Sequence, residues 1–565
     1  MRRSLFLFGL LAGTAAAAGG ALDPADGSAT ARLGPAARAG LPARADRVLV
    51  RLAPALDPSP ILGVRAERLF GRWHRLPVAA AESRATLLAR LAASPGVEQV
   101  ELDALRRIEE PPALAAAAPA EVAPFTPDDP LFPEQWHHRA VEAEAAWAIA
   151  RGAGVDVAVI DSGVSTGGRD LACAPLAAEY DAVGGVEGPG AAADVHGHGT
   201  FIAGIVAQCT DNGEGAAGLA HGARLLAIRA CTADAECAAS DVARAIDWAT
   251  DRGTRVITLS LGFACGGLDW PACSTAIEND AIARAAAAGV LLVAIAGNGA
   301  QDHLGFPANH PDVIGVGGVD ARLLKTSYSS WGSALSLVAP AGDTGVDADS
   351  DGHPDGILQE TLGRICLPIL PYAYCRWQGT SFAGPHVAAA AALLLSHRPA
   401  ANRYQVRRAL EESALDRGAP GFDPIYGHGL LQAAAALARL DAILADDPAS
   451  CTPSPERLCL AGGRFAVEVD WRDFQGGAGR GQALARGADS GLFWFFAPTN
   501  LELMVKVLDG CGVNDRFWVF AAATTDVEYH LRVTDTANGA VRVWDNPLGV
   551  ASPAVTEVSA FPCSP

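Results

Sequence analysis

The sequence has 565 residues, several times the roughly 100–200 residues of a typical domain, so we expect more than one folding unit. Its 43 basic and 63 acidic residues give a formal net charge of −20 at pH 7, which repels phosphate backbones and argues against a nucleic-acid partner. Half of the residues are hydrophobic and 19% are charged, a balance that supports large buried cores and excludes a solvated, disordered acidic chain.

The first residues have the layout of an export signal. Met1-Arg2-Arg3 is basic, and the uncharged run from Ser4 to Ala18 is mostly apolar with small residues at its end. A membrane anchor needs about 20 apolar residues, and this run is shorter. The pattern predicts a secretory signal peptide over residues 1–18 and an extracellular protein. No later segment is long and apolar enough to predict a membrane span.

An arm, a compact unit and a linker follow. Residues 19–45 are rich in Ala, Gly, Pro and Arg without lasting periodicity, which is typical of a flexible leader. Residues 46–110 include the helical pattern of 84–93 and the strand pattern of 97–102, so we expect a small α/β unit there. The Ala- and Pro-rich stretch 111–125 predicts an exposed linker that proteases would cut easily.

Residues 126–447 alternate between short apolar runs and helical patterns. The runs are rich in Val, Ile and Leu, as fully buried strands are. Helical patterns such as 240–250 and 387–395 lie between or after them. Strands separated by helices imply a parallel sheet that is covered by helices on both faces. The five predicted strands are 154–160, 224–228, 256–260, 290–295 and 313–319.

Residues 448–565 have a different pattern. Apolar and polar residues alternate in 465–471, 501–507 and 529–533, which predicts antiparallel strands with one solvated face. We therefore expect an all-β, sandwich-like module. Its aromatic residues are expected to pack in the core and in cross-strand pairs, with a ligand platform as the alternative.

Short motifs in the α/β region carry the residue types that acyl transfer needs. Asp161 follows a predicted strand, His198 opens a helical pattern, and Ser381 precedes another one. An acid, a base and a nucleophile are the three groups of a catalytic triad, and ligands of open parallel sheets collect beyond the strand ends. Asn298 follows a further predicted strand, where its amide can donate a hydrogen bond to the oxyanion of a tetrahedral intermediate.

Each of these motifs alone is most often an ordinary turn or helix start. Together, and in this chain order, they resemble the subtilisin-like serine proteases, or subtilases, over residues 126–445. The resemblance implies a serine endopeptidase that cleaves polypeptides without a catalytic cofactor. In it, Ser381 is the nucleophile, His198 the general base, Asp161 the orienting acid and Asn298 the oxyanion donor. A transpeptidase that uses the same triad and a binding protein with a vestigial catalytic domain are the alternatives.

The resemblance extends to other segments. Ser260, Leu261 and Gly262 look like the segment that pairs with the substrate backbone and borders the specificity pocket. Residues 46–110 resemble an inhibitory propeptide, which assists folding and blocks the cleft until it is removed. The cut is expected somewhere within residues 109–127. The last module resembles a β-rich domain of secreted bacterial proteins, and we expect the protein to be a monomer.

An acidic segment ahead of the nucleophile resembles the start of a calcium-binding loop. Carboxylates alternate around Gly352, which allows a sharp turn, but the twelfth position is Leu358 instead of a bidentate glutamate. Glu360 is a possible substitute, and a solvated acidic loop is the alternative interpretation. Bound calcium would act on stability and not on chemistry. The expected ligands are Asp347, Asp349, Asp351 and Asp355.

Export makes disulfides the natural state of the twelve cysteines. The spacing contains no close C-x-x-C pair, which disfavours zinc. Spacing alone cannot decide connectivity, so the pairing of neighbours in sequence remains one choice among many. That choice joins Cys231 to Cys237, Cys265 to Cys273, Cys366 to Cys375 and Cys451 to Cys459, and leaves Cys173 for Cys209 and Cys511 for Cys563.

Overall fold

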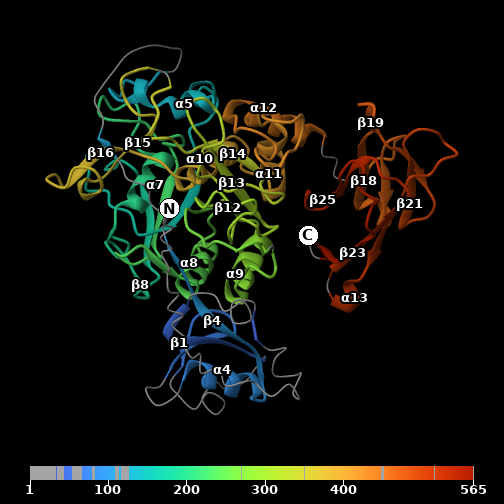
Figure 1. Cartoon of the computed structure of the whole chain (residues 1–565), viewed down its shortest axis with the longest axis horizontal. Helices are drawn as coiled ribbons and strands as arrows, with labels where there is room; N and C mark the ends of the chain where they lie inside the picture. Colours follow the sequence, from blue (N-terminus) through green and yellow to red (C-terminus); the bar gives the residue numbers. More distant parts are fainter. Residues whose placement is uncertain are drawn as a thin grey trace, which may run out of the picture.

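The chain folds into three lobes (Figure 1). A small N-terminal unit drawn in blue lies against a central α/β domain, and an orange-to-red β module lies beside that domain. The expected signal peptide and residues 19–32 of the leader lie outside the described residues. The computed structural model describes residues 33–34, 43–53, 66–78, 83–107, 114–115, 126–268, 270–348, 350–446, 451–514 and 516–563.

An eight-stranded sheet forms the middle of the central domain. Its strands are parallel except for the short edge strand β8 (Val186–Glu187), which pairs antiparallel with its neighbour. Val157 and Val159 of one strand point into one core, and Ala158 and Ile160 point into another. Both faces are therefore covered, as the buried strand pattern predicts. The other strands, in spatial order, are β14 (Leu337–Pro340), β13 (Val313–Val319), β12 (Leu291–Ile295), β11 (Val256–Leu259), β6 (Asp156–Asp161), β9 (Arg224–Arg229) and β7 (Leu176–Asp181).

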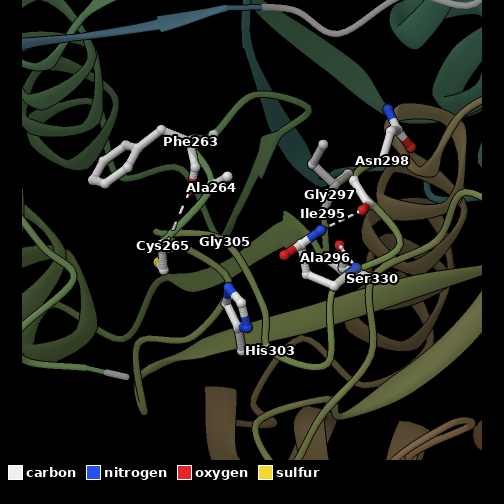
Figure 2. Close-up of a pocket in the computed structure, with 13 residues that line it drawn as sticks. Phe263, Ala264, Cys265, Ile295, Ala296, Gly297, Asn298, His303, Gly305 and Ser330 are labelled. Carbon is white, nitrogen blue, oxygen red and sulfur yellow. Dashed lines mark hydrogen bonds between the residues drawn. The ribbon is translucent and has the colours of Figure 1, made fainter. Parts of the chain in front are cut away.

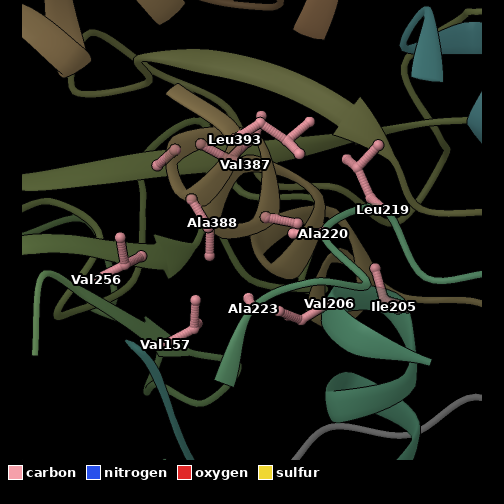
Figure 3. Packing of buried hydrophobic residues seen from close by; sticks show 14 of the residues in the cluster. Val157, Ile205, Val206, Leu219, Ala220, Ala223, Val256, Val387, Ala388 and Leu393 are labelled. Carbon is pink, nitrogen blue, oxygen red and sulfur yellow. The ribbon is translucent and has the colours of Figure 1, made fainter. Parts of the chain in front are cut away.

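Two groups of helices cover the two faces of this sheet. Figure 3 shows Val387 and Ala388 of a long helix over Val157 and Val256 of the strands. On this face lie α7 (His198–Ala207), α10 (Thr380–His397), α11 (Arg403–Glu412) and α12 (Ala433–Asp446), with the short α5 (Trp136–Ala140) and α6 (Ala143–Trp147). On the other face lie α8 (Ala239–Asp251) and α9 (Ala276–Ala287).

Helix α10 begins earlier than the sequence predicts. The predicted helix spans 387–395, whereas the structure places Thr380 at its first position, so Ser381 lies inside the first turn. The predicted start at 387 was therefore wrong, and the helix continues through Pro385. A proline this close to the start removes only the bond to the carbonyl four residues earlier, and the rest of the helix continues.

The N-terminal unit is the small α/β domain that the sequence predicts. Val48, Val50, Leu87 and Leu91 form its own core. Its last strand extends to Arg107, beyond the predicted end at 102, because its continuation finds a backbone partner in the central domain. The elements are β1 (Ala43–Leu52), β2 (Glu67–Arg68), β3 (Trp73–Pro77), α4 (Arg84–Ala93) and β4 (Val97–Arg107), and the partner strand is β10 (Glu236–Ala238).

A second part of the N-terminal region also pairs with the central domain. Strand β5 (Leu114–Ala115) lies antiparallel to β16 (Tyr372–Trp377), which in turn pairs with β15 (Ile357–Leu362). Segments on either side of residues 108–113 are thus held by two different strand edges of the central domain, β10 and β16.

The C-terminal module consists of two antiparallel sheets, which confirms the predicted all-β architecture. Phe465, Phe493, Phe517 and Phe561 pack in the core between them, as expected for most of its aromatic residues. One sheet contains β17 (Leu458–Leu460), β18 (Phe465–Arg472), β19 (Ala478–Arg480), β24 (Glu528–Asp535) and β25 (Ala540–Asn546). The other contains β20 (Gln482–Ala485), β21 (Ser490–Trp494), β22 (Leu503–Asp509), β23 (Arg516–Ala523) and β26 (Val555–Pro562).

All twelve cysteines are paired in six disulfides, and the pairing of sequence neighbours is confirmed. No helix in the described part of the chain is long and apolar enough to cross a membrane. The disulfides join Cys173 to Cys209, Cys231 to Cys237, Cys265 to Cys273, Cys366 to Cys375, Cys451 to Cys459 and Cys511 to Cys563.

Candidate active site

Asp161 and His198 form a buried pair at the carboxyl end of β6. Asp161 is the last residue of the strand, and His198 is the first residue of α7. The imidazole Nδ1 lies 2.8 Å from Asp161 Oδ1 and 3.0 Å from Oδ2, and each side chain is 1% exposed. A proton on Nδ1 then points at the carboxylate, so this contact selects the tautomer in which Nε2 is the basic nitrogen.

Asp194 fixes the loop that leads into α7. Its Oδ1 accepts hydrogen bonds of 2.8 Å from the Ser162 hydroxyl and from the Gly197 amide. Its Oδ2 accepts a bond of 2.9 Å from the amide of Thr200 in the first turn of the helix. A carboxylate is favourable at this positively polarised end of a helix. Sequence reasoning missed Asp194, although an acid just ahead of a helix start is a recognisable capping signal.

Ser381 lies in the first turn of α10, close to Asn298. The Asn298 Oδ1 accepts hydrogen bonds from Thr380, 2.9 Å from its amide and 2.8 Å from its hydroxyl. These bonds orient the side-chain amide with its NH₂ end toward Gly379, where an added Cβ would lie 3.6 Å from Nδ2. Gly379 has a φ of 147°, a backbone conformation that favours glycine. The Asn298 amide is therefore held beside the turn that carries Ser381.

The predicted segment Ser260–Gly262 lies directly behind this turn. Ser260 Oγ donates a hydrogen bond of 2.7 Å to the carbonyl of Ser381. Leu261 is completely buried, while Gly262 lines an adjoining pocket. The segment thus contacts the backbone of Ser381 and forms part of the wall of a cavity.

Asn298 is one of the residues that line this pocket, and Figure 2 shows it together with Phe263 and His303. The loop on one side is held by the disulfide Cys265–Cys273 and by the Gly267 amide, which donates 2.9 Å to His303 Nε2. The pocket has a mostly apolar lining, so it suits an apolar side chain of a ligand. Its lining residues are Gly262, Phe263, Ala264, Cys265, Ile295, Ala296, Gly297, Asn298, Gly299, Gln301, His303, Gly305 and Ser330.

Comparison with known proteins places this arrangement in a family. The model of the "Subtilase family" matches residues 152–429. Subtilisin DY of Bacillus licheniformis is 36% identical over 293 residues, which are 51% of this chain and 92% of that protein. This chain belongs to the subtilase family of serine proteases. The thermophilic serine proteinase of Bacillus sp. (strain AK1) is 36% identical over 294 residues, 52% of this chain and 65% of that protein.

A solved protease structure from Pseudoalteromonas arctica is also similar to this subtilase. It shares 30% sequence identity with a TM-score of 0.49, over 56% of this chain and 99% of that one.

Aromatic rings close the inner side of this subtilase site. The His198 ring lies 5.7 Å from the ring of Trp377 and 5.9 Å from that of Phe382, measured between centroids. Phe382 also packs 4.6 Å from Phe201. Because these rings are buried, they exclude water behind the imidazole and lower the local dielectric. Phe382 follows Ser381 directly, so its contact with His198 brings the turn of Ser381 against the imidazole.

The acidic loop of the subtilase domain is closed by bonds between carboxylates and backbone amides. Asp347 Oδ2 accepts from the Gly352 amide at 3.2 Å, and Asp355 Oδ2 accepts from Ala348 at 2.6 Å. Asp355 is buried, whereas Asp347 and Asp351 are exposed. Within the described residues of this loop, no three carboxylates bring ligand oxygens within 4.8 Å of one another. Asp349 lies outside the described residues.

Glu360, considered as a twelfth-position ligand, lies in another environment. Its carboxylate accepts backbone hydrogen bonds of 3.0 Å from Arg169 and 2.9 Å from Asp170. Burial raises the pKa of the neighbouring Asp170 to about 6 and that of Asp129 to about 6. Glu360 therefore lies beside the buried Asp170 and does not belong to the acidic loop.

Three buried histidines form a cluster, one from α10 and two from α5. His137 Nδ1 is 2.9 Å from His386 Nε2, and His386 Nδ1 lies 2.7 Å from the carbonyl of Phe382. His138 Nε2 lies 2.9 Å from the carbonyl of Ala217. Burial lowers the pKa of His138 to about 3 and that of His386 to about 4, and the pKa of His137 is lowered well below its usual value for the same reason. All three rings are thus neutral at pH 7.

Proposed function

We propose that this subtilase is a secreted serine endopeptidase in which Ser381, His198, Asp161 and Asn298 carry the chemistry. The observation that carries the proposal is the buried contact of 2.8 Å between His198 Nδ1 and Asp161, with the turn of Ser381 packed against the same imidazole. A base oriented by an acid and placed beside a serine is the arrangement that activates a hydroxyl for acyl transfer.

The proposed reaction has two half-steps. Ser381 Oγ attacks the scissile carbonyl while His198 Nε2 takes its proton, and Asp161 stabilises the imidazolium that forms. The Asn298 amide donates a hydrogen bond to the developing oxyanion. His198 then protonates the leaving amine, and water hydrolyses the ester on Ser381 with the same histidine acting as base. We expect the pocket beside Asn298 to bind an apolar side chain of the polypeptide, next to the scissile bond.

The contacts of the N-terminal unit support its role as an inhibitory propeptide. Asp103 of β4 accepts hydrogen bonds from the amide and hydroxyl of Ser240 at the start of α8, at 2.9 and 2.8 Å. Glu101 accepts from the Ala276 amide at the start of α9, at 3.0 Å. Two carboxylates of one strand thus satisfy amides at two helix N-termini, where negative charge is favourable. Arg47 of the same unit also pairs with Asp103 at 2.5 Å, which holds one of these carboxylates in place.

Secretion is supported by the cysteines. Six disulfides with no free thiol among the described residues suit an oxidising compartment, which agrees with the signal peptide predicted for residues 1–18. We propose export followed by removal of the N-terminal unit.

Structural calcium at Asp347, Asp349, Asp351 and Asp355 is retained as a proposal. The carboxylate oxygens and the turn at Gly352, with a φ of 90°, are of the type that calcium sites use. The ion would tie the loop between β14 and β15 together. We expect a chelator to lower the melting temperature of the wild type. It should leave the melting temperature of the Asp347→Asn, Asp351→Asn double variant unchanged. An equal melting temperature of the wild type with calcium and with chelator would contradict calcium binding.

Labelling of the nucleophile tests the enzymatic proposal. After removal of the N-terminal unit, an organophosphonate should modify the wild type stoichiometrically and abolish peptide hydrolysis, while Ser381→Ala should take up no label. Ser396→Ala is the matched control, because Ser396 lies on the same helix but donates its hydroxyl to the carbonyl of Ala153 at 2.9 Å. A folded wild type without label and without hydrolysis would overturn the proposal in favour of a vestigial domain. Product analysis with an added amine separates hydrolysis from transpeptidation.

A further inference from the structure

A polar cleft separates the central domain from the C-terminal module. One wall comes from α11 and α12, and the other from β18, β19 and β24 of the module. Figure 1 shows the module beside these two helices. Asn402 connects the walls at one point, because its side chain contacts the Asn538 carbonyl and the neighbouring Gly539. The lining residues are Ala400, Asn402, Gln405, Arg408, Arg439, Leu444, Arg457, Ala466, Glu468, Arg480, Arg532, Thr534, Thr536, Ala537, Asn538 and Gly539.

Positive charge dominates this cleft. Among the described residues that line it are five arginines and one carboxylate, that of Glu468. The whole chain has a net charge of −20, so the cleft has the opposite sign to the protein as a whole. A recessed cluster of one charge concentrates the electrostatic field and attracts ions of the other charge.

Three of these arginines meet at one carboxylate. Behind the helix wall, the Nε atoms of Arg408 and Arg439 each donate a hydrogen bond of 2.8 Å to the carboxylate of Glu412, and Arg532 lies 3.5 Å from it across the cleft. The pKa of Glu412 is lowered by its arginine contacts in spite of burial, so it is ionised at pH 7.

The module wall carries two further arginines. Glu468 accepts from Arg457 at 3.0 Å and from Arg480 at 3.2 Å, and it lies opposite Arg532 in the register of β18 and β24. Asp470 adds a further contact of 3.4 Å to Arg480. Guanidinium groups therefore lie on both walls of the cleft.

We propose that this cleft binds a multivalent oxyanion, a molecule with two or more phosphate, sulfate or carboxylate groups. Guanidinium groups present pairs of N–H donors that match two oxygens of one such group, and the cleft offers them from two opposed walls. The side chains of Asn402, Gln405, Thr534 and Thr536 add polar groups to the same surface. A bound anion would bridge the central domain and the module, and this inference does not depend on the catalytic proposal.

Titration calorimetry on the full chain carrying Ser381→Ala, at low ionic strength, tests this inference with tripolyphosphate and with citrate as probes. We expect saturable binding of at least one probe, and the probe that binds more tightly identifies phosphate or carboxylate as the preferred group. The association constant should fall steeply between 50 and 200 mM salt, as it does for contacts between arginine and oxyanions.

Two charge changes of opposite direction separate ligand binding from a purely structural role. Arg457→Gln with Arg480→Gln should weaken binding at least tenfold. Glu468→Gln should strengthen it several-fold, because it removes the charge that partly neutralises both arginines. Arg224→Gln is the matched control, since Arg224 pairs with Asp156 on the surface of the central domain at 2.6 Å and should leave affinity unchanged. Melting curves of each variant report whether it is folded.

Three outcomes would overturn the inference. The first is that neither probe binds saturably. The second is that the folded Arg457→Gln, Arg480→Gln double variant binds as tightly as the wild type. The third is that the folded Glu468→Gln variant no longer binds. Each would mean that the arginines only join the two domains.

Discussion

Ser260 Oγ donates a hydrogen bond of 2.7 Å to the carbonyl oxygen of Ser381. In a regular α-helix this carbonyl would accept from the amide four residues later, but that residue is Pro385, which has no N–H. The hydroxyl of Ser260 thus replaces the missing helical donor at the residue that carries the proposed nucleophile. Because Ser260 follows β11 directly, the central sheet holds the first turn of α10 through this bond.

Ser260 is therefore a positioning residue, and its removal should slow the chemical step. We expect Ser260→Ala to lower kcat by about fivefold to tenfold, the value of one buried hydrogen bond, and to change KM little. A double-mutant cycle with Pro385→Ala checks the mechanism, since alanine restores an amide that can donate to Ser381. In that background the loss caused by Ser260→Ala should shrink to less than twofold. An equal loss in both backgrounds would show that the hydroxyl acts in another way.

The contacts of β4 predict how the N-terminal unit is released. Asp103→Asn with Glu101→Gln removes two negative charges from the starts of α8 and α9 while preserving size. We expect the separated unit to inhibit peptide hydrolysis about threefold to thirtyfold more weakly, because each helix terminus contributes roughly 0.3–1 kcal/mol with a charged acceptor. Inhibition constants measured with added N-terminal unit provide the test.

Asp46→Asn is the matched control for this experiment. Asp46 lies in the same unit, but its side chain pairs with Arg44 at 3.2 Å, where both groups are exposed. It should leave inhibition unchanged. If the Asp103 and Glu101 variants inhibited as strongly as the wild type, the helix contacts would not determine the affinity.

The motifs predicted Asp161, His198 and Ser381 because their chemistry needs particular residue types in a particular chain order. The contact of Ser260 with Ser381 could not be predicted, since it joins residues 121 positions apart whose approach depends on the packing of α10 on β11. The early start of α10 was missed for a related reason: the missing donor at Pro385 is replaced by a distant part of the chain. The arginine cleft likewise exists only where two separate folding units meet.

The buried histidines predict a loss of stability in acid. The folded-state pKa of His386 is lowered to about 4 and that of His138 to about 3, so the folded state binds fewer protons than the unfolded state below pH 6.5. Stability from these groups is complete above pH 6.5 and falls as the pH falls from there toward these values. Asp129 and Asp170 oppose this change between about pH 6 and 4, because their pKa values of about 6 make the folded state retain protons.

Comparison with a variant isolates the histidine contribution. We expect His386→Asn to be less stable than the wild type at pH 7.5, because it breaks the contact with His137, but to lose less stability between pH 7.5 and 5. Melting temperatures across this range, measured in one ionic strength, give the two slopes. Parallel curves for the two proteins would contradict a neutral, buried His386 as a source of acid sensitivity.

The two strand pairings of the N-terminal region predict where the precursor is cut. Strand β4 ends at Arg107 on the edge of β10, and β5 begins at Leu114 on the edge of β16. Both edges adjoin the proposed catalytic groups. Cys237 of β10 is bridged to Cys231, and the amide of Cys231 donates a hydrogen bond of 3.1 Å to the Asp161 carbonyl. Strand β16 ends at Trp377, whose ring packs against that of His198. These two paired segments therefore bracket the interval in which we expect the cut.

We expect self-cleavage between Arg107 and Leu114, a narrower interval than the 109–127 suggested by the sequence. N-terminal sequencing of the mature protein should find its first residue between 108 and 114, and Ser381→Ala should stay uncut. Ser396→Ala should mature normally, since its helix is intact and its hydroxyl lies away from the site. If the mature wild type began beyond residue 116, the cut bond would follow the paired segment at Leu114 instead of preceding it. Equal processing of Ser381→Ala would instead assign maturation to another protease.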